Sequence, residues 1–243
     1  MMDSPWTDLL RYGSQLAAGA GLTLQLTLSA ALIAALLALP LAIVLYRQTP
    51  GLYPIVRAYV SFFRGTPLLG QLFLIYYGAG QFRPELQSLG LWGLFREPFW
   101  CALLAFSLNS SAYQAAILRG GLQAVRQGEV EAALAYGFSR GQLYRLVLLP
   151  NAYRIAFPAL GNELILLLKG GAVASIVTLL DLMGQTRRLF AQTFDFTVYC
   201  YAALAYLLIT STLVWLWHLL EKRLTRHLQP AASTPAAAMA TLA

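Results

Sequence analysis

The sequence has few charged residues. Asp, Glu, Lys and Arg make up 11% of its 243 residues, whereas hydrophobic residues make up 58% and the mean hydropathy is +0.61. Soluble domains carry about 25% charged residues, and a water-soluble chain of this length could not hide so much apolar surface. The composition therefore excludes an ordinary soluble enzyme or binding domain and predicts an integral membrane protein.

The sequence also lacks the motifs of several functional classes. It contains no G-x-x-x-x-G-K-[ST] phosphate-binding motif, so we expect this chain not to hydrolyse ATP by itself and to hold no cofactor. Two histidines and two cysteines without C-x-x-C spacing predict no metal site. The net charge of +7 comes without a dense Lys/Arg tract, so nucleic-acid binding is not expected.

The two cysteines, Cys101 and Cys200, both lie in apolar runs. We interpret them as small buried apolar residues, which is how free cysteines usually pack. The alternative is a disulfide, because both cysteines fall near the predicted outer face of the membrane.

Five charge-poor stretches have the composition of membrane-spanning helices. Crossing about 30 Å of hydrocarbon takes about 20 mostly apolar residues. The predicted spans are Leu22–Tyr46, Ser61–Phe82, Pro98–Leu118, Ile155–Leu180 and Phe196–Leu220. The predicted fold is therefore all-α, a multi-pass helical bundle with about five transmembrane helices.

The distribution of basic residues predicts the orientation. If the first connection faces the cytoplasm, eleven Lys and Arg residues lie inside, five lie outside and Lys169 falls within a span. Basic loops prefer the cytoplasm, so we expect the N-terminus outside and the C-terminus inside. Residues 1–20 are then a periplasmic segment and 21–229 the transmembrane domain. The Ala-rich tail 230–243 is uncharged and predicted to be disordered.

The longest cytoplasmic connection spans residues 119–154 and has its own helical pattern. Glu129–Tyr136 favours a helix that Gly137 would end in a left-handed conformation. The capping-box spacing over Ser139–Gln142 predicts a second short helix, with Pro150 closing the unit. Such a helix pair could insert into a cleft on a soluble partner, or could simply lie on the lipid surface.

The spacing within this connection resembles a known signature. Glu131-Ala132-Ala133, then three residues, Gly137, then nine residues and Val147-Leu148-Leu149-Pro150 is similar to the EAA–G–I-x-L-P motif of ABC importer permeases. In that family the loop docks into a groove on the cytoplasmic ATPase subunit. The resemblance implies an ATPase-docking role for the following residues: Glu131, Ala132, Ala133, Gly137, Leu149 and Pro150. We call residues 119–154 the coupling loop.

Two further stretches refine the resemblance. Phe63–Leu68 (Phe-Arg-Gly-Thr-Pro-Leu) and Leu108–Tyr113 (Leu-Asn-Ser-Ser-Ala-Tyr) resemble polar and basic amino-acid permeases of the histidine/arginine type, including opine permeases. One departure is Gly170–Ala172, where a polar Ser/Thr pair is expected after Lys169. Because of that departure, the resemblance does not identify the substrate, although it still indicates the transporter class.

The resemblance implies a transport complex in the bacterial inner membrane. Its parts are two permease subunits, identical or homologous, two cytoplasmic ATPases that bind the ATP, and a periplasmic substrate-binding protein. This chain would not be an enzyme, and it would translocate a polar or basic amino acid or an opine. The alternative is a secondary transporter or channel that acts without an ATPase. It is disfavoured because five spans cannot be halved into inverted repeats.

Charged residues inside the spans are candidates for substrate contact. Glu163 is the only acidic residue in any predicted span, and such residues are costly in lipid and often functional. Lys169 lies six residues later, about 9 Å along the axis and on a different side of the helix. The two could meet opposite ends of an amino acid, or each could be satisfied within the protein, with Lys169 extending to the interface. Asn109 could contact ligand or simply join helices.

Overall fold

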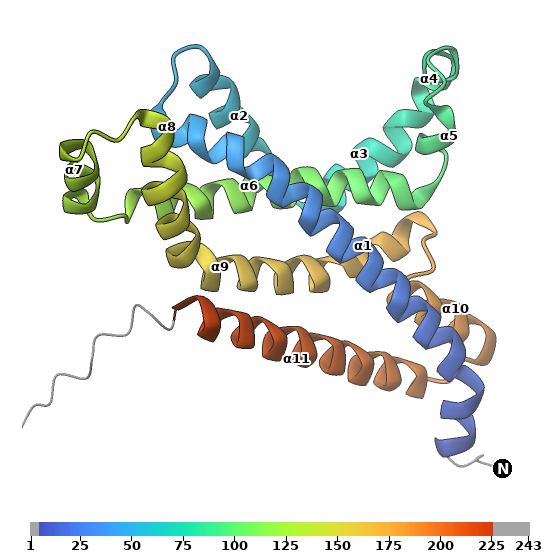
Figure 1. The fold of residues 1–243 in the computed structure, drawn as a ribbon. Helices are drawn as coiled ribbons and strands as arrows, with labels where there is room; N and C mark the ends of the chain where they lie inside the picture. Colours follow the sequence, from blue (N-terminus) through green and yellow to red (C-terminus); the bar gives the residue numbers. More distant parts are fainter. Residues whose placement is uncertain (1–4, 226–243) are drawn as a thin grey trace, which may run out of the picture.

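A computed structural model describes the backbone of residues 5–225 and the side chains of residues 12–224, and these residues are helical with short connections (Figure 1). The predicted all-α class is confirmed. The predicted disordered tail 230–243 lies outside the described residues, as does the start of the segment 1–20. The elements are α1 (Pro5–Arg47), α2 (Leu52–Gly65), α3 (Leu68–Gln81), α4 (Arg83–Ser88), α5 (Trp92–Phe95), α6 (Pro98–Gln123), α7 (Gln127–Ala135), α8 (Arg140–Gln142), the π-helical η1 (Leu143–Leu148), α9 (Leu149–Gly170), the 3-10 helix η2 (Gly171–Val177), α10 (Leu182–Thr193) and α11 (Thr197–Thr225).

Within the described part of the chain, four helical stretches are long and apolar enough to cross a membrane. They are Tyr12–Arg47, Pro98–Gln123, Arg140–Val177 and Thr197–Leu224. These stretches correspond to the first, third, fourth and fifth predicted spans.

The second predicted span, Ser61–Phe82, is not one helix. It is divided between α2 and α3, which have 14 residues each and meet at Thr66-Pro67. Pro67 has no N–H to continue the helix, and it forces the preceding residue out of the helical region. Thr66 is accordingly extended, with φ −116° and ψ 147°. This span is therefore discontinuous in the middle.

Helix α6 is the centre of the bundle, and α1, α2, α3 and α9 pack around it. Small side chains form much of these contacts. The fully buried alanines of α1 recur every four residues and face alanines of α6, which allows the two backbones to approach closely. They are Ala30, Ala34, Ala38 and Ala42 on α1, and Ala102, Ala105, Ala112 and Ala115 on α6.

Helix α11 joins the bundle through α9. The Trp217 ring stacks on Phe157 with 4.5 Å between ring centroids, and its Nε1 donates to the Phe157 carbonyl at 3.1 Å. Gly161 lies under the same indole, where a Cβ would clash with the ring. The glycine thus makes room for the contact that holds the last helix in place.

The two ends of the bundle differ. Figure 1 shows α7, the start of α2 and the C-terminal end of α11 at one end, with α4, α5, α10 and the N-terminal end of α1 at the other. The two ends of the described chain are therefore on opposite sides, as an odd number of crossings requires. Which end faces the cytoplasm stays a prediction from the basic residues.

Asp181 begins α10 at the end of the bundle opposite α7. Its Oδ1 accepts a hydrogen bond from the Gly184 N–H at 2.9 Å, which caps the helix. The side chain is almost fully buried, and burial raises the pKa of Asp181 to about 6 because desolvation disfavours the carboxylate.

The cysteines do not pair. Cys101 is buried and its Sγ donates to the Phe95 carbonyl at 3.2 Å, whereas Cys200 is exposed. The disulfide alternative is therefore wrong for this structure. The interpretation as buried apolar residues holds for Cys101 only, because Cys200 lies on the outward face of α11.

Candidate functional site

Helix α7 projects from one end of the bundle, and its C-terminus ends as the sequence predicts. Gly137 has φ +80°, and its N–H donates to the Leu134 carbonyl at 2.9 Å. The Phe138 N–H donates to the Ala133 carbonyl at 3.1 Å. These two bonds form a Schellman motif, in which the left-handed residue is easiest for glycine. Gly137 thereby fixes where the chain turns after the helix.

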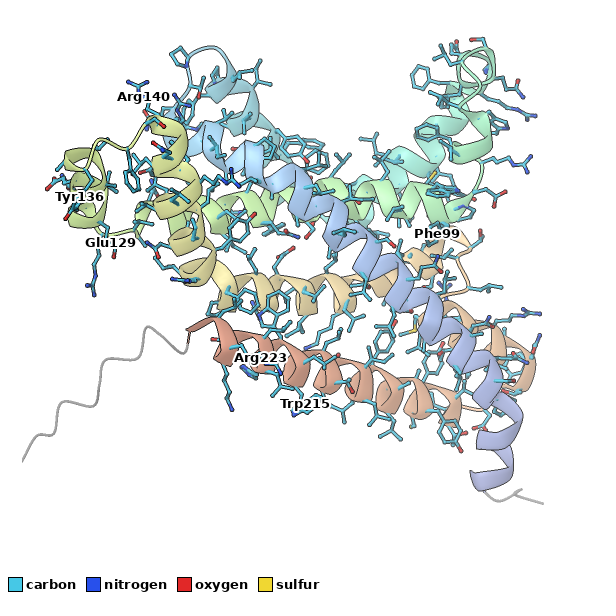
Figure 2. All side chains as sticks on the ribbon, viewed as in Figure 1. Phe99, Glu129, Tyr136, Arg140, Trp215 and Arg223 are labelled. Carbon is cyan, nitrogen blue, oxygen red and sulfur yellow. The ribbon has the colours of Figure 1, made fainter. Side chains whose placement is uncertain are left out.

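Most of α7 is open to solvent. Tyr136 is 86% exposed and Leu134 is 51% exposed, and Glu131 and Ala132 are exposed beside them. Figure 2 shows Tyr136 and Glu129 at the outer tip of the molecule. Among the residues with an expected docking role, Ala133 differs because it is buried in the chain's own core. An exposed aromatic and an exposed leucine on one short helix suit contact with another protein.

The second half of the coupling loop differs from the sequence prediction. The capping box is present, since Ser139 Oγ accepts from the Gln142 N–H and Gln142 Oε1 accepts from the Ser139 N–H. The helix that it starts does not stop near Pro150, however, and it continues through η1 into α9. The prediction of a separate second helix was wrong.

The π-helical turn explains how the helix continues past Pro150. Proline lacks an N–H and its ring clashes with the carbonyl four residues earlier in a regular α-helix. In η1 the Leu149 N–H donates to the Tyr144 carbonyl, five residues back. This wider turn accommodates the proline near the start of α9, and Leu149 and Pro150 are half-buried there.

A side-chain bond ties α7 to the start of α9. Asn151 Nδ2 donates to Glu129 Oε2 at 2.6 Å, and Ala133 packs in the same apolar cluster as Ala152. Glu163 lies twelve residues after Asn151, about 18 Å further along the same helix. One continuous helix therefore runs from the contact with α7 to the middle of the bundle.

The middle of α6 carries a run of polar side chains, Asn109–Gln114, which we call the polar segment. Asn109, Ser110, Ser111 and Gln114 are all buried. Their hydrogen bonds reach α1, α2, α3 and α9, so one stretch of one helix joins four others. Polar groups inside a bilayer have no water to bond to, so these hydrogen bonds within the protein satisfy them instead.

Glu163 of α9 is part of this network. It is only 7% exposed, and its Oε1 accepts a hydrogen bond from Ser110 Oγ at 2.9 Å. Ser110 Oγ in turn accepts from Gln114 Nε2 at 3.2 Å. The positive charge of Arg64, at the end of α2, acts on Glu163 without forming an ion pair, and the Arg64 guanidinium stacks over Tyr113 at 5.3 Å. Glu163 therefore has one side-chain hydrogen bond, from Ser110, and only a longer-range interaction with a basic residue.

Asn109 forms hydrogen bonds at the break between α2 and α3. In an unbroken helix the Phe63 carbonyl would accept from residue 67, but Pro67 has no N–H. Asn109 Nδ2 donates to this carbonyl at 3.0 Å and to Gln71 Oε1 at 2.9 Å. Gln71 Nε2 donates to the Phe63 carbonyl at 3.0 Å and to Thr66 Oγ1 at 2.7 Å. The Asn109–Gln71 pair thus satisfies the backbone that the proline frees.

Lys169 lies apart from Glu163. It is exposed and lines a different cavity of about 450 Å³, between α9, α10 and α11, together with Tyr206 and Thr210. The structure therefore brings Glu163 and Asn109 together around the polar segment but leaves Lys169 outside it. Sequence reasoning missed Ser110, Gln114 and Arg64, although the adjacent polar residues within one predicted span were a visible signal.

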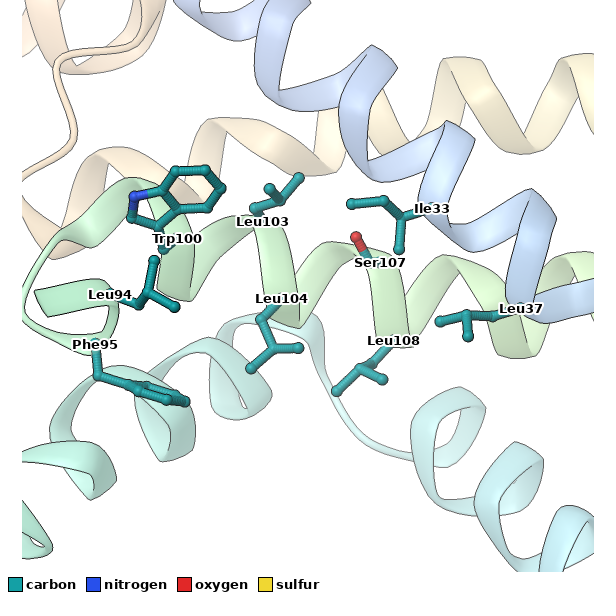
Figure 3. Close-up of a pocket in the computed structure, with 9 residues that line it drawn as sticks. All are labelled: Ile33, Leu37, Leu94, Phe95, Trp100, Leu103, Leu104, Ser107 and Leu108. Atoms are coloured by element: carbon teal, nitrogen blue, oxygen red, sulfur yellow. The ribbon is translucent and has the colours of Figure 1, made fainter. Parts of the chain in front are cut away.

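A second cavity, shown in Figure 3, has a volume of about 320 Å³ and lies between α1, α5 and α6. Its walls are aliphatic and aromatic, and the Ser107 hydroxyl is the only side-chain polar group among its lining residues other than the Trp100 indole nitrogen. An amino acid would lose its water there without gaining charged partners. This cavity is therefore not a site for a zwitterionic ligand.

Comparison with known proteins agrees with this arrangement. Residues 38–230 match the family described as binding-protein-dependent transport system inner membrane component. The chain is 43% identical over 172 residues to the nopaline transport system permease protein NocM of Agrobacterium fabrum, which covers 70% of this chain and 71% of that protein. It is 39% identical over 177 residues to the arginine ABC transporter permease protein ArtM of Escherichia coli, covering 72% and 79% respectively.

Solved structures show the same likeness. The crystal structure of an amino acid ABC transporter with histidines matches with a TM-score of 0.80 at 34% identity, covering 91% of this chain and 100% of that chain. The MetNI methionine ABC transporter, in an inward-facing conformation, shares the fold with a TM-score of 0.73 at 22% identity. The family match covers most of the chain. This multi-pass inner-membrane protein belongs to the family of binding-protein-dependent transport system inner membrane components.

Proposed function

We propose that this chain is the permease subunit of an ABC importer that carries a polar or basic amino acid, or an opine, into the cell. The nopaline and arginine permeases named above support this substrate class. The observation that carries the proposal is the buried Glu163 carboxylate, which holds one hydrogen bond from Ser110 and faces the positive charge of Arg64. A basic amino acid has a cationic group that would complement Glu163 and a carboxylate that would complement Arg64.

The proposed substrate contacts follow from charge. Glu163 would bind a cationic group of the substrate, and Arg64 would bind its carboxylate, because each ion needs a partner where water is scarce. Asn109 would contribute indirectly by fixing the break next to Arg64. Lys169 lines a separate cavity, so it has no part in this proposed site.

The proposed coupling runs through the coupling loop. Glu131, Ala132 and Tyr136 would contact a groove on a cytoplasmic ATPase subunit, with Gly137 fixing the angle of α7. When ATP brings two ATPase subunits together, α7 would move and take the start of α9 with it through the bond between Asn151 and Glu129. Glu163 on the same helix would then be exposed to one side of the membrane and afterwards to the other.

The test is uptake of radiolabelled arginine into proteoliposomes that hold this chain together with its partner ATPase, ATP and the binding protein. We expect uptake only when all of these are present. Uptake driven by a proton or sodium gradient without the ATPase would instead establish the secondary transporter. Full uptake of glutamate with none of arginine would contradict the proposed substrate charge.

The proposed orientation can be tested separately. A cysteine introduced at Gln81, after α3, should react with a membrane-impermeant reagent from outside the cell. A cysteine at Gln142, in the coupling loop, should react only after permeabilisation. The matched background is Cys200→Ser, which removes the exposed native thiol. The reverse labelling pattern would overturn the orientation drawn from the basic residues.

A further inference from the structure

Three arginines line one cavity, and Glu163 is not among its lining residues. The cavity has a volume of about 420 Å³ and lies between α1, α2 and α6, and Arg57, Arg64 and Arg119 all line it. Ser61 and Gln123 add neutral hydrogen-bond donors, and none of the residues that line the cavity is acidic. Three positive charges with no acid among them make this cavity strongly attractive to an anion.

These arginines have few side-chain partners among the residues that the structure describes. Among the side chains of residues 12–224, none of the three arginines forms an ion pair. The Arg64 charge is partly offset by Tyr113 and Glu163. Arg119 has no comparable offset, and its Nε is buried without a hydrogen-bond partner. Leaving a buried charged donor unpaired is costly, so a ligand that accepts from Arg119 would stabilise this region.

The part of the cavity that Arg57 and Arg119 line is at the depth of lipid headgroups, and Arg64 at the far end of α2 lies deeper. Leu45 in its wall is two residues before the end of α1, Arg57 is five residues after the start of α2, and Arg119 is four residues before the end of α6. At about 1.5 Å per residue, these positions are about 3–8 Å inside the helix ends. The headgroup region on each side of a bilayer has a similar thickness, about 5–8 Å.

We propose that this cavity binds the phosphate of an anionic phospholipid. Guanidinium groups match phosphate geometry with paired hydrogen bonds, which a lysine could not supply. Basic pockets between transmembrane helices at the end of a bundle are a known way to hold such headgroups. The apolar side chains of Leu45 and Val60 in the same cavity can meet the glycerol and first acyl carbons. The cavity shares Arg64 with the proposed substrate contact, so the lipid proposal rests on Arg57 and Arg119 and needs only the membrane location that the family establishes.

The headgroup would join α2 and α6, the two helices that carry the arginines. The α2 half-helix ends at the break near Thr66, whereas α6 is continuous. A phosphate shared by Arg57 and Arg119 would hold the membrane-end halves of α2 and α6 together. Loss of the lipid should therefore loosen the start of α2.

The test is native mass spectrometry of the purified full-length chain with phosphatidylglycerol or phosphatidylcholine. We expect Arg57→Gln/Arg119→Gln to lower the bound fraction of phosphatidylglycerol about tenfold, with phosphatidylcholine weak throughout. The matched control is Lys222→Gln/Arg223→Gln, which removes the same charge at the same end of the molecule, on α11 and outside the cavity. The control should lose less than about twofold, since only bulk attraction changes.

Three results would overturn the proposal. Equal loss in both double variants would mean general surface attraction, and unchanged binding in the Arg57/Arg119 variant would exclude the cavity. Displacement of phosphatidylglycerol by inorganic phosphate alone would assign the site to a soluble anion. If the double variant does not elute as a single species, Arg119→Lys serves instead. This variant keeps the positive charge but loses the paired N–H donors of the guanidinium group. It should bind less phosphatidylglycerol than the native chain and more than Arg119→Gln. Equal binding by all three proteins would contradict the assignment.

Discussion

Helix α7 and the polar segment of α6 are opposite kinds of region. α7 projects from the bundle with Tyr136 and Leu134 exposed, and its shape is set by local bonds at Gly137 and by one side-chain bond to Asn151. The polar side chains Asn109, Ser110, Ser111 and Gln114 of the polar segment are buried, and together they bond to four other helices. The exposed side chains of the first region suit contact with a partner, and the second region keeps a carboxyl group buried inside the bundle. Single substitutions should therefore act differently in the two regions.

The largest effect is expected at the end of α7. Gly137→Val should reduce uptake by at least about tenfold, because a β-branched residue at φ +80° is strained by about 1–3 kcal/mol and the turn after α7 would shift. Membrane insertion should be normal. The matched control is Gly137→Asn, since asparagine tolerates the left-handed region and should keep most of the transport. Equal uptake by the native chain and the valine variant would show that α7 does not carry coupling.

The next effect separates charge from structure in the polar network. Glu163→Gln keeps the size and the bond to Ser110 but removes the charge, so uptake of arginine should fall about tenfold while expression and basal ATPase activity persist. Asn162→Gln is the control, because Asn162 is adjacent but exposed. Undiminished arginine uptake by Glu163→Gln would make Glu163 a purely structural residue.

A smaller effect is expected at Asn109, and it should be one of stability. Asn109→Ala leaves the Phe63 carbonyl with Gln71 as its one remaining side-chain partner. Hydrogen bonds between membrane helices contribute about 0.6–1.7 kcal/mol each, so the midpoint of thermal unfolding in detergent should fall by a few degrees. Asn162→Ala, which removes an exposed amide, should leave it unchanged. A Tm that is the same in Asn109→Ala and the native chain would mean that the break does not need this bond.

The smallest effect is expected at Asp181, far from both regions. Its folded-state pKa of about 6 lies above its ordinary value of 3.8, so the folded protein binds the extra proton between these values. This contribution to stability is complete below about pH 4 and is lost as pH rises through about 6. The Tm should therefore be higher at pH 5 than at pH 7.5. Asp181→Asn can still cap α10 and should reduce this difference, and an identical pH dependence in both proteins would assign it to other groups.

The sequence predicted the local features well. The capping box at Ser139–Gln142 and the left-handed Gly137 depend on residues within one turn of each other, so their spacing was sufficient. The apolar stretches likewise placed four spans, because the bilayer fixes the length that a helix needs. Pro67 is the residue in the sequence that indicates the break between α2 and α3. The prediction missed this break because it used the average composition of the whole span.

The features that were missed depend on residues far apart in the chain. Lys169 and Glu163 are close in sequence, yet the turn from α9 into η2 and the position of α11 put Lys169 in a separate cavity. Pro150 was expected to end a helix, and the wide turn of η1 instead carries the helix through it. No local pattern indicates that Arg119 would lie opposite Arg57, because they are on different helices.

The sequence alone therefore determined that this chain is a membrane-spanning helical protein, and it located the coupling loop by spacing. Both conclusions rest on short-range physics, namely the cost of exposing polar backbone in lipid and the conformational limits of single residues. Only the tertiary structure decided which polar groups meet: Asn109 with the carbonyl freed by Pro67, Ser110 with Glu163, and Arg57 with Arg119 around one cavity. Those pairings follow from how α2, α6 and α9 pack, and packing is determined by the shapes of all the helices together.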